Sequence, residues 1–221
     1  MITPVHEDYL KAIYVLQEEH ERVSTNNLAE RLEVSAPSAT SMVKRLAQLK
    51  LLDYEPYRGV RLTVEGEKIA LKVIRLHRLL ELYLAEALGL PWNQVHEEAE
   101  KLEHVLSEIL EERISIALGN PTVDPHGDPI PDRHLMVEQP QGLPLSQVEA
   151  GRSVVVLRVL SKDSERLSYL GSLGLYPNTE IELLEKAPFN GPLTLEVGDN
   201  RHSIAYEMAE LILVKETKAD Y

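Results

Sequence analysis

Three short segments near the start of the chain carry apolar residues at helical spacing. The first covers residues 8–19, where apolar side chains recur every three or four positions behind Asp8. Ser24 and Ser35 each open another such segment, and Pro37 stands in the first turn of the last one, as is typical of helix starts. Only a tight turn separates the last two segments. The pattern therefore predicts three helices, the last two in a helix-turn-helix arrangement.

A β-hairpin is predicted directly after the third helix. Residues 51–55 and 60–63 form its expected strands, and Arg58 lies near its tip. A hairpin in this position is typical of a winged helix-turn-helix, whose second motif helix enters the DNA major groove. Hydroxyl side chains on that helix suit base edges, and neighbouring cations suit phosphates. The predicted DNA-binding residues are Arg31, Ser35, Pro37, Ser38, Thr40, Ser41, Lys44, Arg45 and Arg58.

Two longer amphipathic helices and a β-rich end are predicted downstream. The helices cover residues 64–88 and 92–118, with a Gly-Leu-Pro break between them. Six of the 13 prolines fall within residues 119–144, which predicts a linker. Short β strands after this segment are expected to close into a small barrel, because an open sheet of this size exposes its edges. The expected elements are strands at 153–160, 179–184 and 193–197, a return strand through Ile204, and a helix at 166–173. The fold class is thus mainly α with a small all-β C-terminal domain.

Composition narrows the classes of protein that remain. No apolar run approaches the roughly 18 residues that a membrane span needs. The N-terminus has neither the basic start nor the apolar core of a signal peptide. Both observations predict a cytoplasmic protein with no membrane partner. The chain has no Cys, so any metal must be held by His nitrogen and carboxylate oxygen. The net charge of −13 argues against nucleic acid as a partner. Residues 22–61, however, carry seven cations against four carboxylates, a net charge of +3, as expected of a DNA-binding head on an acidic body.

Histidines and carboxylates recur at ligand spacing in the two long helices. On the predicted helix 92–118, His96, Glu100, Glu103 and His104 stand at i, i+4, i+7 and i+8, within one stripe. On the preceding helix, His77 and Glu81 form an i, i+4 pair, and Asp8 on the first helix is a further candidate. Such a set without thiolate is typical of Mn²⁺, Fe²⁺ or Zn²⁺, and its many oxygens favour Mn²⁺. Other glutamates on the same helix leave the alternative that this is an ordinary solvated face.

These motifs, taken in order, resemble one known family. The chain is similar to the diphtheria toxin repressor and manganese transport regulator family of cytoplasmic, metal-activated, dimeric transcription regulators, the larger of which end in a barrel of the SH3 or FeoA type. The resemblance covers the whole chain. It rests on YLKAIY, AERLEVSAPSATSMVKRL, the Tyr-Arg-Gly wing at 57–59, HRLLE at 77–81, VHEEAEKLEH at 95–104 and PHGDPIP at 125–131.

The resemblance implies two metal sites. The primary site would consist of Asp8, Glu100, Glu103 and His104, with acids where iron-responsive members carry Met and Cys, so the metal implied is Mn²⁺ with Fe²⁺ as the alternative. The ancillary site would consist of His77, Glu81, His96 and a barrel residue, for which Asp163 is preferred to Glu165. His126 matches a ligand position of streptococcal-type relatives. Lys11 stands where short manganese regulators carry Glu, which favours two separated sites over a binuclear one.

The sequence therefore predicts a manganese-responsive, metal-activated homodimeric repressor of metal transport genes that binds a palindromic operator and is not an enzyme. The expected domains are a winged helix-turn-helix over residues 1–63, a helical dimerisation and metal-binding domain with its linker over 64–140, and an SH3-like barrel over 146–221. An iron-responsive regulator, a winged helix with an organic effector, and a helical di-metal enzyme are the alternatives. The enzyme is disfavoured because the chain lacks the paired Glu-x-x-His motifs of such bundles.

Overall fold

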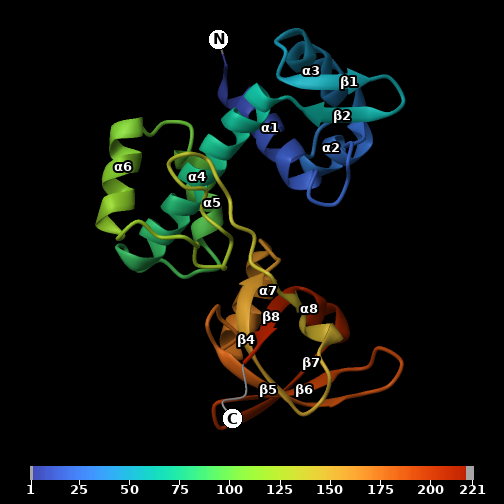
Figure 1. Ribbon diagram of the computed structural model, residues 1–221, viewed down its shortest axis with the longest axis vertical. Helices are drawn as coiled ribbons and strands as arrows, with labels where there is room; N and C mark the ends of the chain where they lie inside the picture. The colour runs from blue at the N-terminus through green and yellow to red at the C-terminus, as the bar shows by residue number, and fades with distance from the viewer. Residues whose placement is uncertain (1, 218–221) are drawn as a thin grey trace. The chain divides into compact units, whose positions relative to one another are not determined.

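The computed structural model describes residues 2–217, coloured along the chain in Figure 1. These residues form two compact units. The first unit contains the chain up to His77 together with Glu103–Leu106 and Pro131–Met136. The second contains Arg78–Leu102, Ser107–Ile130 and the chain from Val137 onward. The two units are described separately below.

The first unit contains a helix-turn-helix followed by a hairpin, as predicted. Its serine caps are in place: the Ser24 hydroxyl accepts from the backbone N–H of Asn27 at 3.0 Å, and Ser35 accepts from Ser38 at 3.3 Å. The two strands of the hairpin pair antiparallel. The elements are α1 (Pro4–Leu16), α2 (Thr25–Arg31), α3 (Ala36–Gln48), β1 (Leu52–Glu55), β2 (Gly59–Leu62) and the beginning of α4 (Val64–Glu86).

Helix α1 begins four residues earlier than the sequence pattern suggested. Thr3 is its N-cap residue and Pro4 stands in its first turn, so Asp8 lies in the second turn rather than at the start. The earlier beginning places Glu7 and Asp8 side by side in the chain within a formed helix. Both residues that carry these carboxylates are therefore fixed in position by the helical backbone.

The core of the first unit joins the helices to the wing. Leu10 and Ile13 of α1 are fully buried together with Leu28 of α2 and Leu46 of α3, in one cluster. The wing packs against Val23 at Gly59, directly after the hairpin turn, where φ is +101° and there is no room for a side chain: a Cβ there would lie 2.5 Å from the Val23 carbonyl oxygen. The orientation of α1 is therefore tied to that of α3 and of the wing.

The helix predicted over residues 92–118 is instead two helices. Helix α5 (Val95–Leu102) ends before Glu103, and α6 (Glu108–Ala117) begins after Ser107, whose hydroxyl accepts from the backbone N–H of Leu110 at 3.3 Å. The serine cap explains the break, because it replaces an intrahelical hydrogen bond at the new N-terminus. Of the four predicted ligands, only His96 and Glu100 therefore lie on α5. Glu103 and His104 follow it in a non-helical turn.

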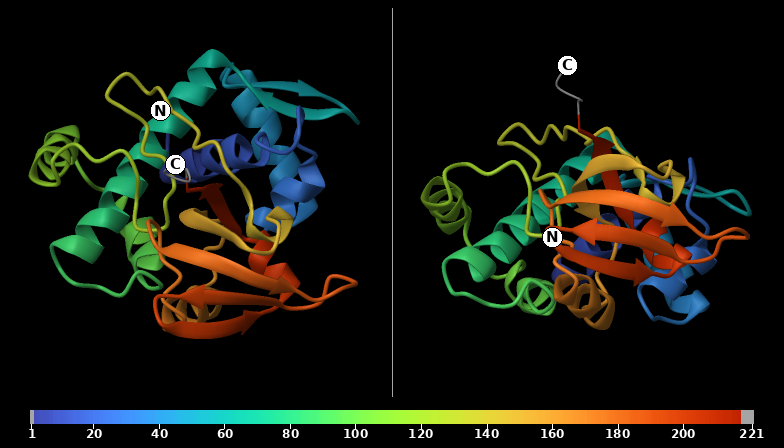
Figure 2. Two further views of the ribbon diagram at one scale, coloured as in Figure 1. Left: turned by 60° about the horizontal axis from the view of Figure 1, so that its bottom comes forward. Right: turned by 90° about the horizontal axis from the view of Figure 1, so that it is seen from below.

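The second unit ends in an antiparallel β sheet with the strand order β3-β8-β4-β5-β6-β7, shown from two further sides in Figure 2. Its core includes Val154, Leu167, Leu183 and Leu195, all fully buried. This confirms the all-β C-terminal domain, while β8 and α8 were not predicted. The elements are β3 (Leu143–Pro144), a 3₁₀ turn (Leu145–Gln147), β4 (Arg152–Val159), α7 (Ser164–Ser172), β5 (Glu180–Lys186), β6 (Leu193–Val197), β7 (Asn200–Ile204), α8 (Tyr206–Glu210) and β8 (Ile212–Glu216).

The proline-rich segment is not a loose linker. Residues 126–131 are buried, and the Asp124 carboxylate shapes the turn by accepting the backbone N–H groups of His126 at 2.8 Å and Asp128 at 2.9 Å. A buried backbone requires such partners, and this side chain supplies two of them. Among the described residues, no helix is long and apolar enough to cross a membrane.

Candidate metal centre and nucleic-acid interface

A first group of ligand atoms lies in the first unit. Asp8, Glu103 and His104 each offer one atom within 4.8 Å of the other two. His104 Nε2 lies 2.8 Å from Asp8 Oδ1 and 3.4 Å from Glu103 Oε1. The contact between His104 and Asp8 joins α1 to the turn that follows α5. Two carboxylates and an imidazole at this spacing fit a divalent cation that accepts oxygen and nitrogen ligands.

Glu7 completes the surroundings of His104 and was not among the predicted residues. Its Oε2 lies 2.7 Å from His104 Nδ1, so both ring nitrogens face carboxylate oxygens. Ionised carboxylates only accept hydrogen bonds, so the ring donates from both nitrogens and is charged. Burial alone lowers the pKa of His104, but the hydrogen bond to Glu7 and the charges of Asp8 and Glu103 outweigh it, and this pKa is raised above 6.5.

Lys11 and His77 occupy the other side of Glu103. Lys11 Nζ donates to Oε1 and Oε2 of Glu103 at 2.9 Å each and lies 3.2 Å from His77 Nδ1, which also contacts Glu103. The Glu103 side chain is fully buried, so the ammonium provides the counter-charge that a buried carboxylate requires. Lys11, which stands where short manganese regulators carry Glu, thus forms an ion pair with the predicted ligand Glu103.

A second group of ligand atoms lies in the second unit. Glu81, Asp124 and His126 are all buried and offer atoms within 4.8 Å of one another. His96 Nδ1 lies 2.8 Å from Glu81 Oε1, while His96 Nε2 lies 3.7 Å from Glu100 Oε1. The predicted ligands therefore divide between the two units. The first unit contains Asp8, His77, Glu103 and His104, and the second contains Glu81, His96, Glu100, His126 and Asp163.

The second group already contains a cation from the protein itself. Lys162 Nζ lies 2.6 Å from Asp128 Oδ2, 3.3 Å from His126 Nδ1, 3.7 Å from Asp124 Oδ2 and 3.8 Å from Glu81 Oε1. Burial alone lowers the pKa of Lys162, but the surrounding carboxylates outweigh it, and the pKa is raised. The ammonium is therefore charged.

The two aspartates of this group differ in their electrostatic surroundings. Burial raises the pKa of Asp124, and the neighbouring carboxylates of Asp128 and Glu81 add to that rise, with Lys162 opposing it. For Asp128, burial also acts upward, but the charges of Lys162 and Arg158 outweigh it and hold the pKa far below its usual range. Arg158 contacts Asp128 directly.

Asp163, the predicted barrel ligand, caps a helix of the second unit. It is the N-cap residue of α7, and its Oδ1 accepts the backbone N–H of Arg166 at 2.8 Å. The segment in which a ligand was expected does reach Glu81, but through the adjacent Lys162 ammonium. The sequence did not distinguish these neighbours, because the capping position of Asp163 depends on where α7 begins.

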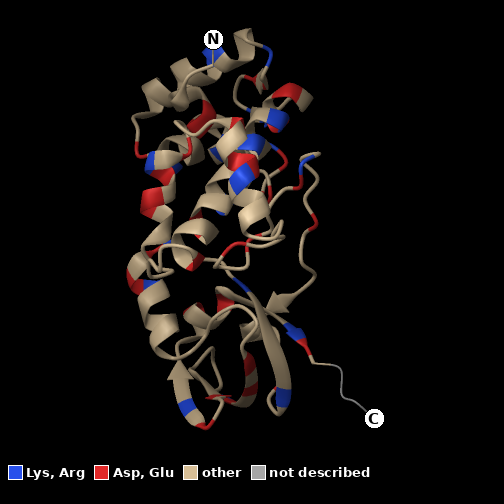
Figure 3. Ribbon diagram, turned by 90° about the vertical axis from the view of Figure 1, so that its left-hand side faces the viewer, with Lys and Arg blue, Asp and Glu red and all other residues tan. Residues whose placement is uncertain are grey.

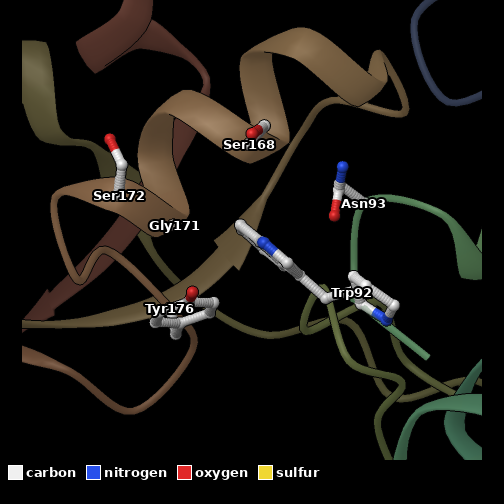
Figure 4. A pocket seen from close by; sticks show the side chains of 7 residues that line it. Trp92, Asn93, Ser168, Gly171, Ser172 and Tyr176 are labelled. Carbon is white, nitrogen blue, oxygen red and sulfur yellow. The ribbon is translucent and has the colours of Figure 1, made fainter. Parts of the chain in front are cut away.

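A shallow pocket of about 400 Å³ lies beside the second group. Figure 4 shows Trp92 projecting toward α7, with Tyr176 beside it and Asn93 at the rim. The Trp92 ring stacks on His126 with centroids 5.5 Å apart and is tilted against Tyr176 at 4.8 Å. The backbone carbonyl oxygen of Trp92 lies 2.8 Å from His126 Nε2. Because a carbonyl only accepts, Nε2 carries the proton and Nδ1 presents its lone pair to Lys162.

The predicted DNA-binding side chains lie on the surface of the first unit. Thr40 is partly exposed, and the other eight predicted residues are exposed. Figure 3 shows Lys and Arg positions interspersed with Asp and Glu positions along the ribbon. Arg58 on the wing pairs with Glu55 at 3.0 Å, and Tyr57 beside it is fully exposed.

Helix α6 of the second unit exposes apolar side chains. Ile109 is 77% exposed and Ile116 is 53% exposed, seven residues apart on the same helix face. Most of the other apolar residues of the long helices are buried within the single chain, including Ile74, Leu79 and Ile114. The apolar surface left for a partner is therefore narrower than the sequence suggested.

Three family models cover nearly the whole chain. Residues 1–60 match the N-terminal DNA-binding domain of the iron-dependent repressors, residues 63–132 match their metal-binding and dimerisation domain, and residues 143–216 match the FeoA domain. The chain belongs to the iron-dependent repressor family. The resemblance seen in the sequence is thereby confirmed. The relatives in this family are DNA-binding, metal-dependent repressors, so the protein is a transcription regulator and not an enzyme.

Individual members of the iron-dependent repressor family match along nearly their full length. The iron-dependent repressor IdeR of Mycobacterium leprae is 34% identical over 221 residues, which is 95% of this chain and 96% of that protein. The diphtheria toxin repressor of Corynebacterium efficiens is 32% identical over 219 residues, or 92% of this chain and 95% of that protein. Both iron-dependent and manganese-dependent proteins are among the matches.

Two solved structures extend the comparison. A manganese-dependent transcriptional repressor in complex with manganese has a TM-score of 0.88 and 36% identity, covering 96% of this chain and all of the other. The manganese regulator SloR has a TM-score of 0.77 and 34% identity, covering 98% of this chain and all of the other.

Proposed function

We propose that this protein is a manganese-activated, homodimeric repressor that binds a palindromic operator and controls metal transport genes. One observation carries the proposal: Asp8 in α1, which shares its core with the helix-turn-helix, and His104 in the turn after α5 lie 2.8 Å apart, with Glu103 beside them. A cation bound by these three residues connects the DNA-binding motif to a segment far along the chain. Asp8, Glu103 and His104 are the proposed activating ligands, and Glu100 remains a ligand expected from the sequence.

The core explains how a cation at this position acts on DNA binding. Helix α1 shares its buried cluster with α2, α3 and the wing, so restraining Asp8 restrains the recognition helix. A bound divalent ion supplies positive charge that holds the carboxylates together. If the ion binds more tightly when α1 is in the DNA-competent orientation, linkage requires that it favour DNA binding by the same factor.

The choice of manganese rests on the ligand chemistry. Two of the three side chains supply oxygen and none supplies sulfur, which suits Mn²⁺ better than softer metals. The similarity to manganese-dependent repressors supports the same choice. An iron-responsive regulator of the same family is the second candidate, because the iron-dependent repressor IdeR is similar over nearly the whole chain.

The DNA and dimer partners follow from two surfaces. The exposed hydroxyls and cations of α3 suit the major groove, and the wing offers Arg58 to phosphate. The apolar face at Ile109 and Ile116 is proposed to pack against a second copy. Two recognition helices related by a two-fold axis then require an operator with inverted half-sites.

Fluorescence anisotropy tests the proposal. A labelled duplex from the gene's own upstream region is titrated with protein at fixed salt, first with chelator and then with Mn²⁺, Fe²⁺ or Zn²⁺. We expect tight binding only with metal, with Mn²⁺ effective. The variant Asp8→Ala should lose metal-dependent binding while staying dimeric, and Glu19→Ala, at an exposed acid beyond the end of α1, is the matched control. Equal binding in chelator would instead favour an organic effector.

A further inference from the structure

We propose that the Lys162 ammonium is the permanent cation of the Glu81, Asp124 and His126 cluster, so that this cluster binds no metal in the native chain and becomes a metal site when Lys162 is removed. The cluster lies in the second unit and shares no residue with the proposed activating site. The inference therefore assigns one residue the role of deciding how many metal ions the protein takes up.

The first support is the position of the ammonium. Lys162 Nζ faces every member of the cluster, at 3.3 Å from His126 Nδ1, 3.7 Å from Asp124 Oδ2 and 3.8 Å from Glu81 Oε1. A divalent ion bound to the same three atoms would have to lie next to this charge. In a buried, weakly screened site, repulsion between an ammonium and a divalent cation is severe.

The second support is the state of His126. Its Nε2 proton is donated to the Trp92 carbonyl oxygen, so Nδ1 is the nitrogen that would ligate a metal. That lone pair accepts from Lys162 instead. The imidazole is thus already in the tautomer and orientation of a ligand, and the lysine occupies its free position.

The third support is the balance of charge. Glu81, Asp124 and Asp128 contribute three carboxylates, and Lys162 with Arg158 contributes two cations in direct contact or close to them. Removing Lys162 takes its charge away from the buried carboxylates of Glu81 and Asp124, and a divalent ion can replace that charge. Asp124 Oδ2 is buried and, among the described residues, accepts no hydrogen bond, so this oxygen is available to such an ion.

Lys162 also connects the turn between β4 and α7 to helix α4 without a metal ion. Lys162 precedes the α7 cap and connects it to Glu81 of α4 and to Asp128 of the buried proline-rich turn. In an ion-dependent arrangement, this connection would be lost in chelator. Lys162 is itself part of the chain, so its contacts with Glu81 and Asp128 persist without any ion.

Metal counting on the full-length protein tests the inference. Bound Mn²⁺ and, separately, Zn²⁺ are measured by equilibrium dialysis and elemental analysis for the wild type, Lys162→Met and Lys215→Met, the last being an exposed lysine on β8. We expect Lys162→Met to bind one more ion per chain than the wild type and Lys215→Met to match the wild type. The double variant with Asp124→Asn should lose the added ion. No gain in Lys162→Met would overturn the proposal.

The single variant Asp124→Asn decides the question even if Lys162→Met does not fold. Its amide oxygen can still accept the two backbone N–H groups of the turn, so the local structure is kept. We expect it to bind as many ions as the wild type, and a loss of one ion would show that metal binds there beside Lys162. Repeating the comparison in Asp8→Ala separates this inference from the proposed activating site, because the gain of one ion should persist whether or not Asp8 is a ligand.

Discussion

The Lys11 ammonium lies 2.9 Å from both oxygens of the buried Glu103 carboxylate. Glu103 also supplies one of the three ligand atoms of the proposed activating group, so a metal ion bound there would share this carboxylate with the Lys11 ammonium. We expect Lys11 to stabilise the metal-free fold and at the same time to oppose metal binding, because it neutralises Glu103. The metal affinity of this proposed site should therefore depend partly on a residue that is not a ligand.

Replacing Lys11 with Met should raise Mn²⁺ affinity about tenfold, a change of about 1.4 kcal/mol, because the ion no longer competes with an adjacent ammonium. The metal-free variant should melt at a lower temperature, since Glu103 loses its counter-charge. Isothermal titration with Mn²⁺ and thermal unfolding in chelator measure the two effects. The exposed Lys215→Met is the control, and an unchanged affinity in Lys11→Met would refute competition at Glu103.

Glu7 is predicted to hold the His104 ring in place for metal. Changing it to Gln keeps the size of the side chain but weakens its contact with Nδ1, which lies 2.7 Å away. Groups that orient a ligand commonly contribute tenfold or more to affinity, so we expect about a tenfold weaker Mn²⁺ affinity and an intact dimer. Titration of Glu7→Gln beside Glu19→Gln checks this, and equal affinities would show that Glu7 has no orienting role.

Mn²⁺ affinity should rise with pH. His104 binds a proton between two carboxylates, and its pKa is raised above 6.5 because these carboxylates outweigh the effect of burial. A metal ion must displace that proton, so affinity falls as pH drops through the raised pKa. In the metal-free protein the sign is opposite: the charged imidazole stabilises the fold fully below pH 6.5, and this contribution is lost as pH rises through the raised pKa. In a pH series, the Mn²⁺ affinity from titrations should therefore rise with pH, while the contribution of His104 to the stability measured by unfolding in chelator should fall.

Association of two copies should depend on the exposed face of α6. Ile109→Asp places a charge at a side chain that is 77% exposed, so the monomer should fold normally while the dimer weakens. Sedimentation analysis should detect monomer, and operator binding should fall with it. Leu88→Asp, at another exposed apolar residue of the same unit, is the control and should remain dimeric. A fully dimeric Ile109→Asp would place the interface elsewhere.

Lys44 on α3 is predicted to contact phosphate. Lys44→Ala should weaken binding to specific and unrelated duplexes alike and reduce the slope of log K against log salt by about 1. Anisotropy at several salt concentrations measures that slope, with Lys215→Ala as the control. A loss confined to the specific duplex would instead indicate that Lys44 reads a base.

Local signals in the sequence predicted the helix-turn-helix and wing because their determinants are close in the chain. The Ser24 and Ser35 caps each bond a backbone group three residues away. Most of the strands were also found, from alternation, from β-branched apolar runs and from the turns between them. The break at Ser107 was missed because an amphipathic pattern continues across it, and the start of α1 was placed at Asp8 although Thr3 and Pro4 supply a cap and a first turn.

The site residues also divide into those that local spacing predicted and those that only the fold brings together. Spacing brought His96 and Glu100 together on one helix, but it could not show that Glu7 meets His104 or that Lys162 meets Glu81, because these pairs are far apart in the sequence. Such contacts depend on how separate elements pack. The cations beside the carboxylates were therefore the least predictable part of both groups.

The chain leaves the first unit at His77 and returns to it twice, at Glu103–Leu106 and at Pro131–Met136. The helix-turn-helix together with its wing is continuous, but Asp8 and His104 are separated by nearly the whole helical region. Cutting the gene after the wing would thus yield a DNA-binding fragment that lacks the partners of Asp8. A DNA-binding head exchanged between two such repressors would carry Glu7 and Asp8 with it, while Glu103 and His104 would have to come from the recipient chain. Sensing would then survive the exchange only where the two halves are compatible.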